Sequence, residues 1–269
     1  MRASVVGAVC LVAFAVGACG GTDEEGQPSA TGTANSSQPL TVVALGDSWP
    51  EGAHCGGCRT FAGLYADGLE AETSRAITFV DLTGQAQPFF DSEGGGTASL
   101  LHALLDDDTF QEKVASGDAI MIATGPNEIG RAFEPYAAGN CGKSDDYECV
   151  KRLEDFWRGN FNDILDEIDR LRGGRPTAVR LVSAANFFVS DPSATEGLPR
   201  DAMTFGSKVF KALNDAACDA ARAHQASCVD VRRVLNGPTL DQPVDENSAA
   251  SMQAVADALL ATGIRELNE

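Results

Sequence analysis

The 269-residue sequence is short of positive charge. It has 20 lysines and arginines against 39 aspartates and glutamates, which gives a formal net charge of −19. Proteins that bind nucleic acid need clustered positive charge to meet the phosphates, and no basic stripe or stacking pattern interrupts this acidic composition. The sequence therefore argues against a nucleic-acid partner, and a solvated acidic surface accounts for most of the charge.

The sequence also lacks an N-terminal hydrophobic run long enough for a membrane-spanning helix. The apolar stretch Val5 to Val16 is too short to cross a bilayer, and it follows a short positive start. It leads into Gly17-Ala18-Cys19, which resembles the bacterial lipobox, whose cysteine is lipidated and becomes the mature N-terminus. We expect a signal peptide over residues 1–18 and a lipid on Cys19. A plain secretory signal cleaved nearby is the alternative.

The segment behind Cys19 has almost nothing to bury. Residues 20–39 are mainly Gly, Ser, Thr, Pro and acidic residues, so residues 19–39 predict a lipidated cysteine followed by a flexible linker. Residues 40–269 suffice for one domain with a sizeable core. We expect a protein held at the outer face of the cell membrane by its lipid anchor only, or alternatively a secreted one.

The chain has eight cysteines, of which Cys10 leaves with the signal and Cys19 carries the lipid. The remaining even number, in an oxidising compartment, predicts disulfides. The most economical pairing joins sequence neighbours: Cys55 with Cys58, Cys141 with Cys149, and Cys218 with Cys228. A redox motif or half a zinc site at Cys55-Gly56-Gly57-Cys58 is the alternative, but no second ligand pair has suitable spacing. We expect neither a metal nor a cofactor.

Hydrophobic periodicity predicts the fold. Short apolar runs predict strands at 41–45, 77–82, 118–123, 178–183 and 228–231, and most are apolar enough for a sheet covered on both faces. Helical patterns lie between them, near 59–73, 98–115, 203–224 and 249–263, and most clearly from Val150 to Leu171. This alternation predicts a three-layer α/β/α sandwich with a central parallel sheet of about five strands.

Three short motifs each follow one of the first three predicted strands. They are Gly46-Asp47-Ser48, Thr83-Gly84-Gln85 and Thr124-Gly125-Pro126-Asn127-Glu128. The carboxyl ends of parallel strands meet at one edge of a sheet, where ligands bind. In this order the motifs resemble those of the SGNH (GDSL-type) hydrolases, which have a flavodoxin-like fold. The segment from Cys55 to Tyr65 and the stretch Leu235 to Pro238 are similar to exported actinobacterial members.

The resemblance implies a serine esterase. Ser48 is then the nucleophile, and the backbone N–H groups of Ser48 and Gly84 form an oxyanion hole with the side-chain amide of Asn127. Standing alone, Gly84 would be read as a turn glycine and Asn127 as a loop cap. The implied substrate is a small acyl ester or an O-acetyl ester on a small molecule or glycan, and we expect a monomer.

Histidine is the residue that is missing where the family needs it. The family carries Asp-x-x-His before its last helix, with His as the general base. The chain has only His54, His102 and His224, and the corresponding segment holds Glu246 at the His position or, shifted by one residue, Asp245. A carboxylate with a pKa raised by burial is one replacement, and His54 folded back over Ser48 is another.

Two hypotheses follow. The first is a lipid-anchored esterase that uses Ser48 with an unusual base. The second is a protein of this fold that binds a glycan or acyl ligand without turnover. The intact nucleophile and donors favour the first, and the missing histidine favours the second.

Overall fold

The computed structural model describes residues 38–52, 55–86, 95–143, 146–190 and 198–267, which lie within the unit Asn35–Glu269. The expected signal peptide, Cys19, nearly all of the expected linker and His54 lie outside the described residues. In the described part of the chain, no helix is long and apolar enough to cross a bilayer.

The described strands form a single parallel sheet in the order β2-β1-β3-β4-β5. Their bounds are Leu40–Gly46 for β1, Ile77–Asp81 for β2, Ala119–Ala123 for β3, Ala178–Val182 for β4 and Ser227–Val229 for β5. The predicted five-stranded parallel sheet is confirmed. The last strand is shorter than predicted, because the Asp230 side chain already accepts from the Arg233 N–H, at 3.3 Å, and begins the next helix.

The helices alternate with the strands. They are α1 (Ser48–Glu51), α2 (Phe61–Thr73), α4 (Gly96–Asp106), α5 (Asp108–Ser116), the 3-10 helix η2 (Pro126–Ile129), α6 (Gly130–Ala137), α7 (Glu148–Arg172), α8 (Phe187–Ser190), α9 (Ala202–Ala223), α10 (Val231–Leu235), α11 (Ala249–Leu260) and η4 (Arg265–Leu267). The predicted helix at 98–115 is two helices. Asp107 adopts an extended conformation between them, and its side chain accepts from the Phe110 N–H at 3.0 Å, which caps the start of α5.

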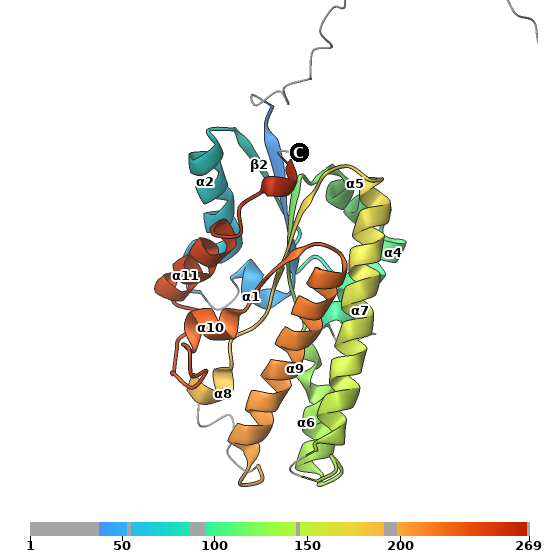
Figure 1. Cartoon of the computed structure of the whole chain (residues 1–269), viewed down its shortest axis with the longest axis vertical. Helices are drawn as coiled ribbons and strands as arrows, with labels where there is room; N and C mark the ends of the chain where they lie inside the picture. Colours follow the sequence, from blue (N-terminus) through green and yellow to red (C-terminus); the bar gives the residue numbers. More distant parts are fainter. Residues whose placement is uncertain (1–37, 53–54, 87–94, 144–145, 191–197, 268–269) are drawn as a thin grey trace, which may run out of the picture. The chain divides into compact units, whose positions relative to one another are not determined.

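The sheet is covered on both faces, as Figure 1 shows with α2 and α11 on one side and α7 and α9 on the other. Successive residues of each strand pack alternately into two separate hydrophobic cores. Val43, Ile120 and Leu181 pack against α4, α5, α7 and α9, whereas Val42, Met121 and Val182 pack against α2 and α11. Burial of successive residues on opposite faces explains why the strands are continuous apolar runs in the sequence.

Among the described residues the predicted disulfide pairs are all present. Cys55–Cys58 lies between α1 and α2, Cys141–Cys149 between α6 and α7, and Cys218–Cys228 joins α9 to β5. The Cα atoms of the pairs are 5.4, 4.9 and 5.1 Å apart, within the usual range for disulfides. Each bridge closes a short loop at the boundary of a helix.

The strand order reverses between β1 and β3. The chain leaves β1 toward β2 on one side, and then returns to build β3, β4 and β5 on the other. This is the flavodoxin-like order, in which the crevice at the carboxyl ends of the two strands flanking the reversal is open to a ligand. Two of the three sequence motifs follow these two strands.

Candidate active site

Ser48 begins α1 directly beyond the end of β1. Gly46 pairs with Ala123 of β3 and has a φ of 150°, and a Cβ there would overlap the Ala123 carbonyl oxygen, so only glycine fits. Asp47 caps the four-residue helix, since its side chain accepts from the Trp49 N–H at 3.3 Å. The turn leaves Ser48 half-buried at the β1/β3 crevice, with no hydrogen bond from its hydroxyl to another described residue.

Gly84 lies beside Ser48 but its N–H is already engaged. It has a φ of 67° and donates to the Gly46 carbonyl oxygen at 2.9 Å, which ties the end of β2 to the end of β1. In this structure the Gly84 N–H is therefore not free for an oxyanion, contrary to the role expected from the sequence. Gly84 contributes instead to the wall of a cavity next to Ser48.

Asn127 lies on η2, the single turn that follows β3. Its side chain is exposed, and it lines the same two cavities as Ser48. The structure therefore brings the predicted amide to the predicted nucleophile. Of the three hydrogen-bond donors expected for the oxyanion hole, the third is the backbone N–H of Ser48, at the start of α1.

Glu128, next to Asn127, is a buried carboxyl group that holds η2 in place. It accepts hydrogen bonds from the Thr97 hydroxyl at 2.8 Å, the Ala98 N–H at 3.0 Å and the Trp157 indole at 2.7 Å. Burial raises its pKa, against the effect of these donors. The longer acid thus reaches across to α4 and α7, and it fixes the turn that presents Asn127.

Glu246 is the acidic residue that the structure brings to Ser48. It is half-buried and lines a cavity together with Ser48 and Asn127, and its carbonyl oxygen accepts from the Trp49 indole at 3.4 Å. Asp245 is exposed, and its side chain accepts from the Asn247 N–H at 3.0 Å within its own turn. The structure therefore favours Glu246 over Asp245 at the position of the expected histidine.

The carboxyl groups of Glu246 and Asp47 have unusual proton affinities. Burial and the negative charges of Asp245 and Asp47 raise the pKa of Glu246 to about 7. Burial, with a smaller contribution from Glu128, raises the pKa of Asp47 to about 7, although the N–H groups of Trp49 and Gly125 oppose the change. The buried Oδ2 atom of Asp47 has no hydrogen-bond partner among the described residues. Groups with pKa values near 7 in a crevice are typical of catalytic sites.

The two described histidines lie elsewhere. His102, on α4, pairs with Asp106 at 3.0 Å, and His224, at the end of α9, contacts the Asn162 side-chain oxygen at 3.2 Å. Neither lines a cavity that contains Ser48. Within the described part of the chain, the carboxyl groups of raised pKa at Ser48 are those of Glu246 and Asp47, of which Asp47 is engaged in capping α1. His54 stays a prediction.

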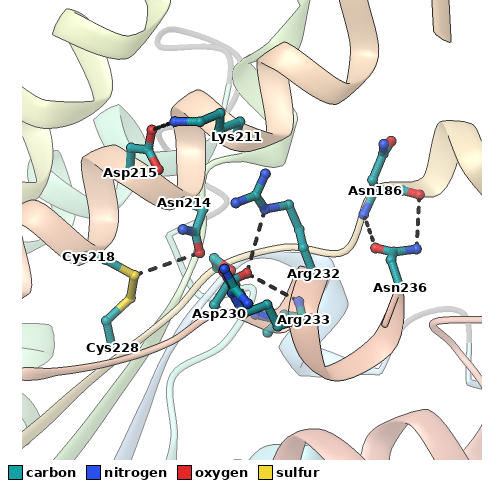
Figure 2. A network of polar contacts seen from close by, with 12 residues as sticks. Asn186, Lys211, Asn214, Asp215, Cys218, Cys228, Asp230, Arg232, Arg233 and Asn236 are labelled. Carbon is teal, nitrogen blue, oxygen red and sulfur yellow. Dashed lines mark hydrogen bonds and ion pairs between the residues drawn. A yellow bond between two sulfur atoms is a disulfide. The ribbon is translucent and has the colours of Figure 1, made fainter. Parts of the chain in front are cut away.

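A pair of buried asparagines, which sequence reasoning did not single out, supports the loop that carries Glu246. The side-chain oxygen of Asn236 accepts from the Asn186 N–H at 2.8 Å (Figure 2). Its amide donates to the Gln242 carbonyl oxygen at 3.0 Å. The Asn236 side chain is fully buried. In the sequence this anchor is marked only by the stretch from Leu235 to Pro238, whose resemblance to exported proteins does not indicate a structural role.

Two cavities meet at Ser48. The smaller, of about 150 Å³, has a wall of glycines that includes Gly84, Gly95 and Gly96. The larger, of about 360 Å³, extends from Ser48 to Glu246 and has an aromatic wall that no motif in the sequence indicates. Among the described residues, no group of three or more His, Cys, Asp or Glu side chains could hold a metal ion. The arrangement combines a hydroxyl, an amide donor and a carboxyl of raised pKa around one opening.

The strand order and the strand-end motifs define an α/β fold of the SGNH hydrolase type. Solved structures with this fold include a lipase from a goat rumen metagenome, with 19% identity and a TM-score of 0.61 over 84% of this chain and 98% of that one. An extracellular lipase from Streptomyces rimosus has 16% identity and a TM-score of 0.55, over 82% of this chain and 99% of that one. A phospholipase A1 from Streptomyces albidoflavus has 16% identity and a TM-score of 0.53, over 82% and 98%.

No family model and no curated protein sequence matches the chain. At these levels of identity the solved structures establish a shared fold, and the activity has to be argued from the site.

Proposed function

We propose that this protein is a serine ester hydrolase in which Glu246 replaces the usual histidine. The observation that carries the proposal is that Ser48, Asn127 and Glu246 line one cavity, and that the pKa of Glu246 is raised to about 7. An ordinary carboxylate is too weak a base for a serine hydroxyl, whereas a base with a pKa near 7 is matched to neutral pH.

In the proposed reaction, the Ser48 oxygen attacks the ester carbonyl while the Glu246 carboxylate takes the hydroxyl proton. The Asn127 amide and the Ser48 N–H donate to the oxyanion that develops. Collapse of this intermediate expels the alcohol, which takes the proton from Glu246, and leaves an acyl group on Ser48. Water, deprotonated by Glu246, then releases the acid and restores the hydroxyl.

For the substrate we propose a small acyl or O-acetyl ester. The small glycine-walled cavity beside Ser48 supports a compact group on one side of the scissile bond. The location proposed is the outer face of the bacterial cell membrane, through a lipid on Cys19, or alternatively the medium. Three disulfides support an oxidising compartment. We propose that the protein acts as a monomer.

A second candidate is a protein that binds a glycan or acyl ligand without turnover. Two observations favour it: the Gly84 N–H is engaged by Gly46, and neither described histidine lies at Ser48. Loss of an oxyanion donor and a base would each cost orders of magnitude in rate.

Turnover of p-nitrophenyl acetate by the purified protein separates the two candidates. We expect the wild-type rate to exceed that of Ser48→Ala by about 10²-fold or more, because the variant keeps the cavity but lacks the nucleophile. A Ser48→Thr variant and circular dichroism serve as controls for the fold. Equal rates for wild type and Ser48→Ala would overturn the hydrolase proposal and favour binding without turnover.

A further inference from the structure

The larger cavity at Ser48 has an aromatic wall. Trp49 comes from α1, Phe187 from α8 and Phe210 from α9. The rings of Phe187 and Phe210 meet edge to face, with centroids 5.0 Å apart and an interplanar angle of 79°. Phe210 is only 1% exposed and supports the wall from the core, whereas Trp49 and Phe187 are half-buried and remain accessible to a ligand. The volume of about 360 Å³ is within the range of small-molecule sites.

The same cavity is acidic. Asp47 and Glu246 line it, and no lysine or arginine is among the described residues that line either cavity at Ser48. A third carboxylate, that of Glu51, lies at the smaller cavity, because a Cβ at Gly84 would lie 2.7 Å from Glu51 Oε2. An anionic group would therefore meet like charge here without a described cation to offset it.

Aromatic rings beside carboxylates, in a cavity too apolar to hydrate a charge fully, are the combination that binds organic cations. We infer that the larger cavity binds a protonated amine or quaternary ammonium group, and that the ester cleaved at Ser48 carries this cation. The statement about the ester rests on the proposed function, whereas binding of the cation does not. A metal ion is a poor alternative occupant, since the described carboxyl groups do not form a ligand cluster.

The carboxyl groups around the cavity also make the affinity for a cation depend on pH. Asp47 before α1, Asp245 and Glu246 before α11, and Glu128 on η2 repel one another, which helps to keep protons on Asp47 and Glu246 near neutral pH. A bound cation favours the ionised carboxylates. Affinity for the cation should therefore rise with pH through about 7, while affinity for a neutral molecule of the same shape should not.

Tryptophan fluorescence provides a direct binding assay. The chain has two tryptophans; Trp157 is buried and Trp49 lines the cavity. We expect choline to change the emission with an affinity about tenfold higher than that of its neutral isostere 3,3-dimethyl-1-butanol. The difference should shrink between about pH 8 and about pH 5.5. Equal affinities for choline and the neutral alcohol would overturn the inference.

Two variants locate the effect. Glu246→Gln removes one charge and Phe187→Leu removes one half-buried ring, and each should weaken choline binding by about tenfold while changing the binding of the neutral alcohol little. Glu112→Gln, at an exposed position on α5, is the matched charge control and should behave as the wild type. Unchanged choline binding in Glu246→Gln would contradict the assignment of the cation to this cavity.

Turnover then separates this inference from the proposed function. The pair is acetylthiocholine and 3,3-dimethylbutyl thioacetate, compared by kcat/KM in wild type and Ser48→Ala. Faster Ser48-dependent cleavage of the cationic ester, by about tenfold, supports both proposals. Equal cleavage of the two esters supports the hydrolase and overturns the cationic substrate. Preferred binding of choline without cleavage of either ester supports the cation site and contradicts the hydrolase.

Discussion

At the scale of single residues, the chemistry depends on the environment of Glu246. A free glutamate has a pKa near 4.3, and a base that weak leaves a serine hydroxyl largely unreactive. Burial and the charges of Asp245 and Asp47 raise the pKa to about 7, close to that of imidazole. A carboxyl group can therefore offer the proton affinity of the histidine that the segment lacks, with burial as the largest cause of the raised pKa.

The first prediction concerns this carboxyl. Glu246→Gln should lower kcat for the ester by about 10²–10⁴-fold, the usual contribution of a general base. In the wild type, kcat/KM should rise with pH through about 7, as the carboxyl loses its proton. Because Asp47 titrates in the same range, the inflection belongs to both groups together. A pH–rate profile measures both effects.

Asp245→Asn is the matched control for Glu246→Gln. It removes a neighbouring charge without touching the base, so activity should persist and the inflection should move to lower pH. If Glu246→Gln keeps the wild-type rate, or if Asp245→Asn is the variant that loses activity, the assignment of the base is wrong.

Sequence reasoning predicted Ser48, Asn127 and the neighbourhood of Glu246, but it left the register open. A shift of one residue exchanges Glu246 for Asp245, and nothing in an irregular loop fixes that register locally. The structure separates them because the Asp245 side chain caps its own turn while Glu246 lines the cavity. The engagement of the Gly84 N–H was also beyond the sequence, since it depends on how closely two strand ends approach.

At the scale of secondary-structure elements, Glu128 acts as a bridge. Helix α4 begins after Gly95, which has no side chain with which to cap it. Glu128 supplies the missing acceptor from η2, by accepting from the Ala98 N–H in the first turn of α4. The same carboxyl accepts from Trp157 of α7. One side chain thus joins two helices to the turn that presents Asn127.

The second prediction tests this bridge. Glu128→Gln keeps the shape but replaces one of the two acceptor oxygens by an NH₂ group, so either the Ala98 N–H or the Trp157 indole loses its acceptor. It should lower the free energy of unfolding by about 1–3 kcal/mol, the cost of unsatisfied buried polar groups. Denaturant titration measures the loss. Glu134→Gln, on the exposed surface of α6, should change stability by less than about 0.5 kcal/mol. Equal stability of the two variants would contradict the bridging role.

Helices could be predicted from the sequence where buried residues recur periodically. They could not be predicted where a polar side chain sets the helix boundary. The stripe from Val150 to Leu171 belongs to α7, whose C-cap Gly173 has a left-handed φ of 61°. The helix predicted at 98–115 is broken by the cap at Asp107, which periodicity does not register. The one-turn helices α1, α8 and α10 are likewise too short to produce a hydrophobic pattern.

At the scale of the whole molecule, the fold followed from the sequence because the sheet is buried on both faces and each disulfide is local. The acidic composition has a thermodynamic consequence that no single site shows. With 39 acidic residues against 20 basic ones, mutual repulsion grows as carboxyl groups ionise. Asp201 has the opposite pH dependence. The hydroxyls of Tyr147 and Tyr136 lower its pKa and favour its charged form, so its stabilising contribution is lost as the pH falls.

The third prediction is that the protein is more stable at about pH 5 than at about pH 8. In the folded state the pKa values of Asp47 and Glu246 are raised from 3.8 and 4.5 to about 7. Their stabilising contribution is complete below the unfolded values and is lost as pH rises toward about 7. The free energy of unfolding should fall by about 2 kcal/mol or more across this window, since one pKa unit corresponds to about 1.4 kcal/mol.

Denaturant titrations of the wild type and of the double variant Asp47→Asn/Glu246→Gln test the origin of this pH dependence. The variant removes both raised carboxyl groups and leaves the surface charge otherwise intact, so it should lose most of the difference between the two pH values. Salt screens exposed charges far more than buried ones. A difference that vanishes at high salt in the wild type would therefore assign it to surface repulsion, whereas persistence in salt and loss in the double variant would assign it to Asp47 and Glu246.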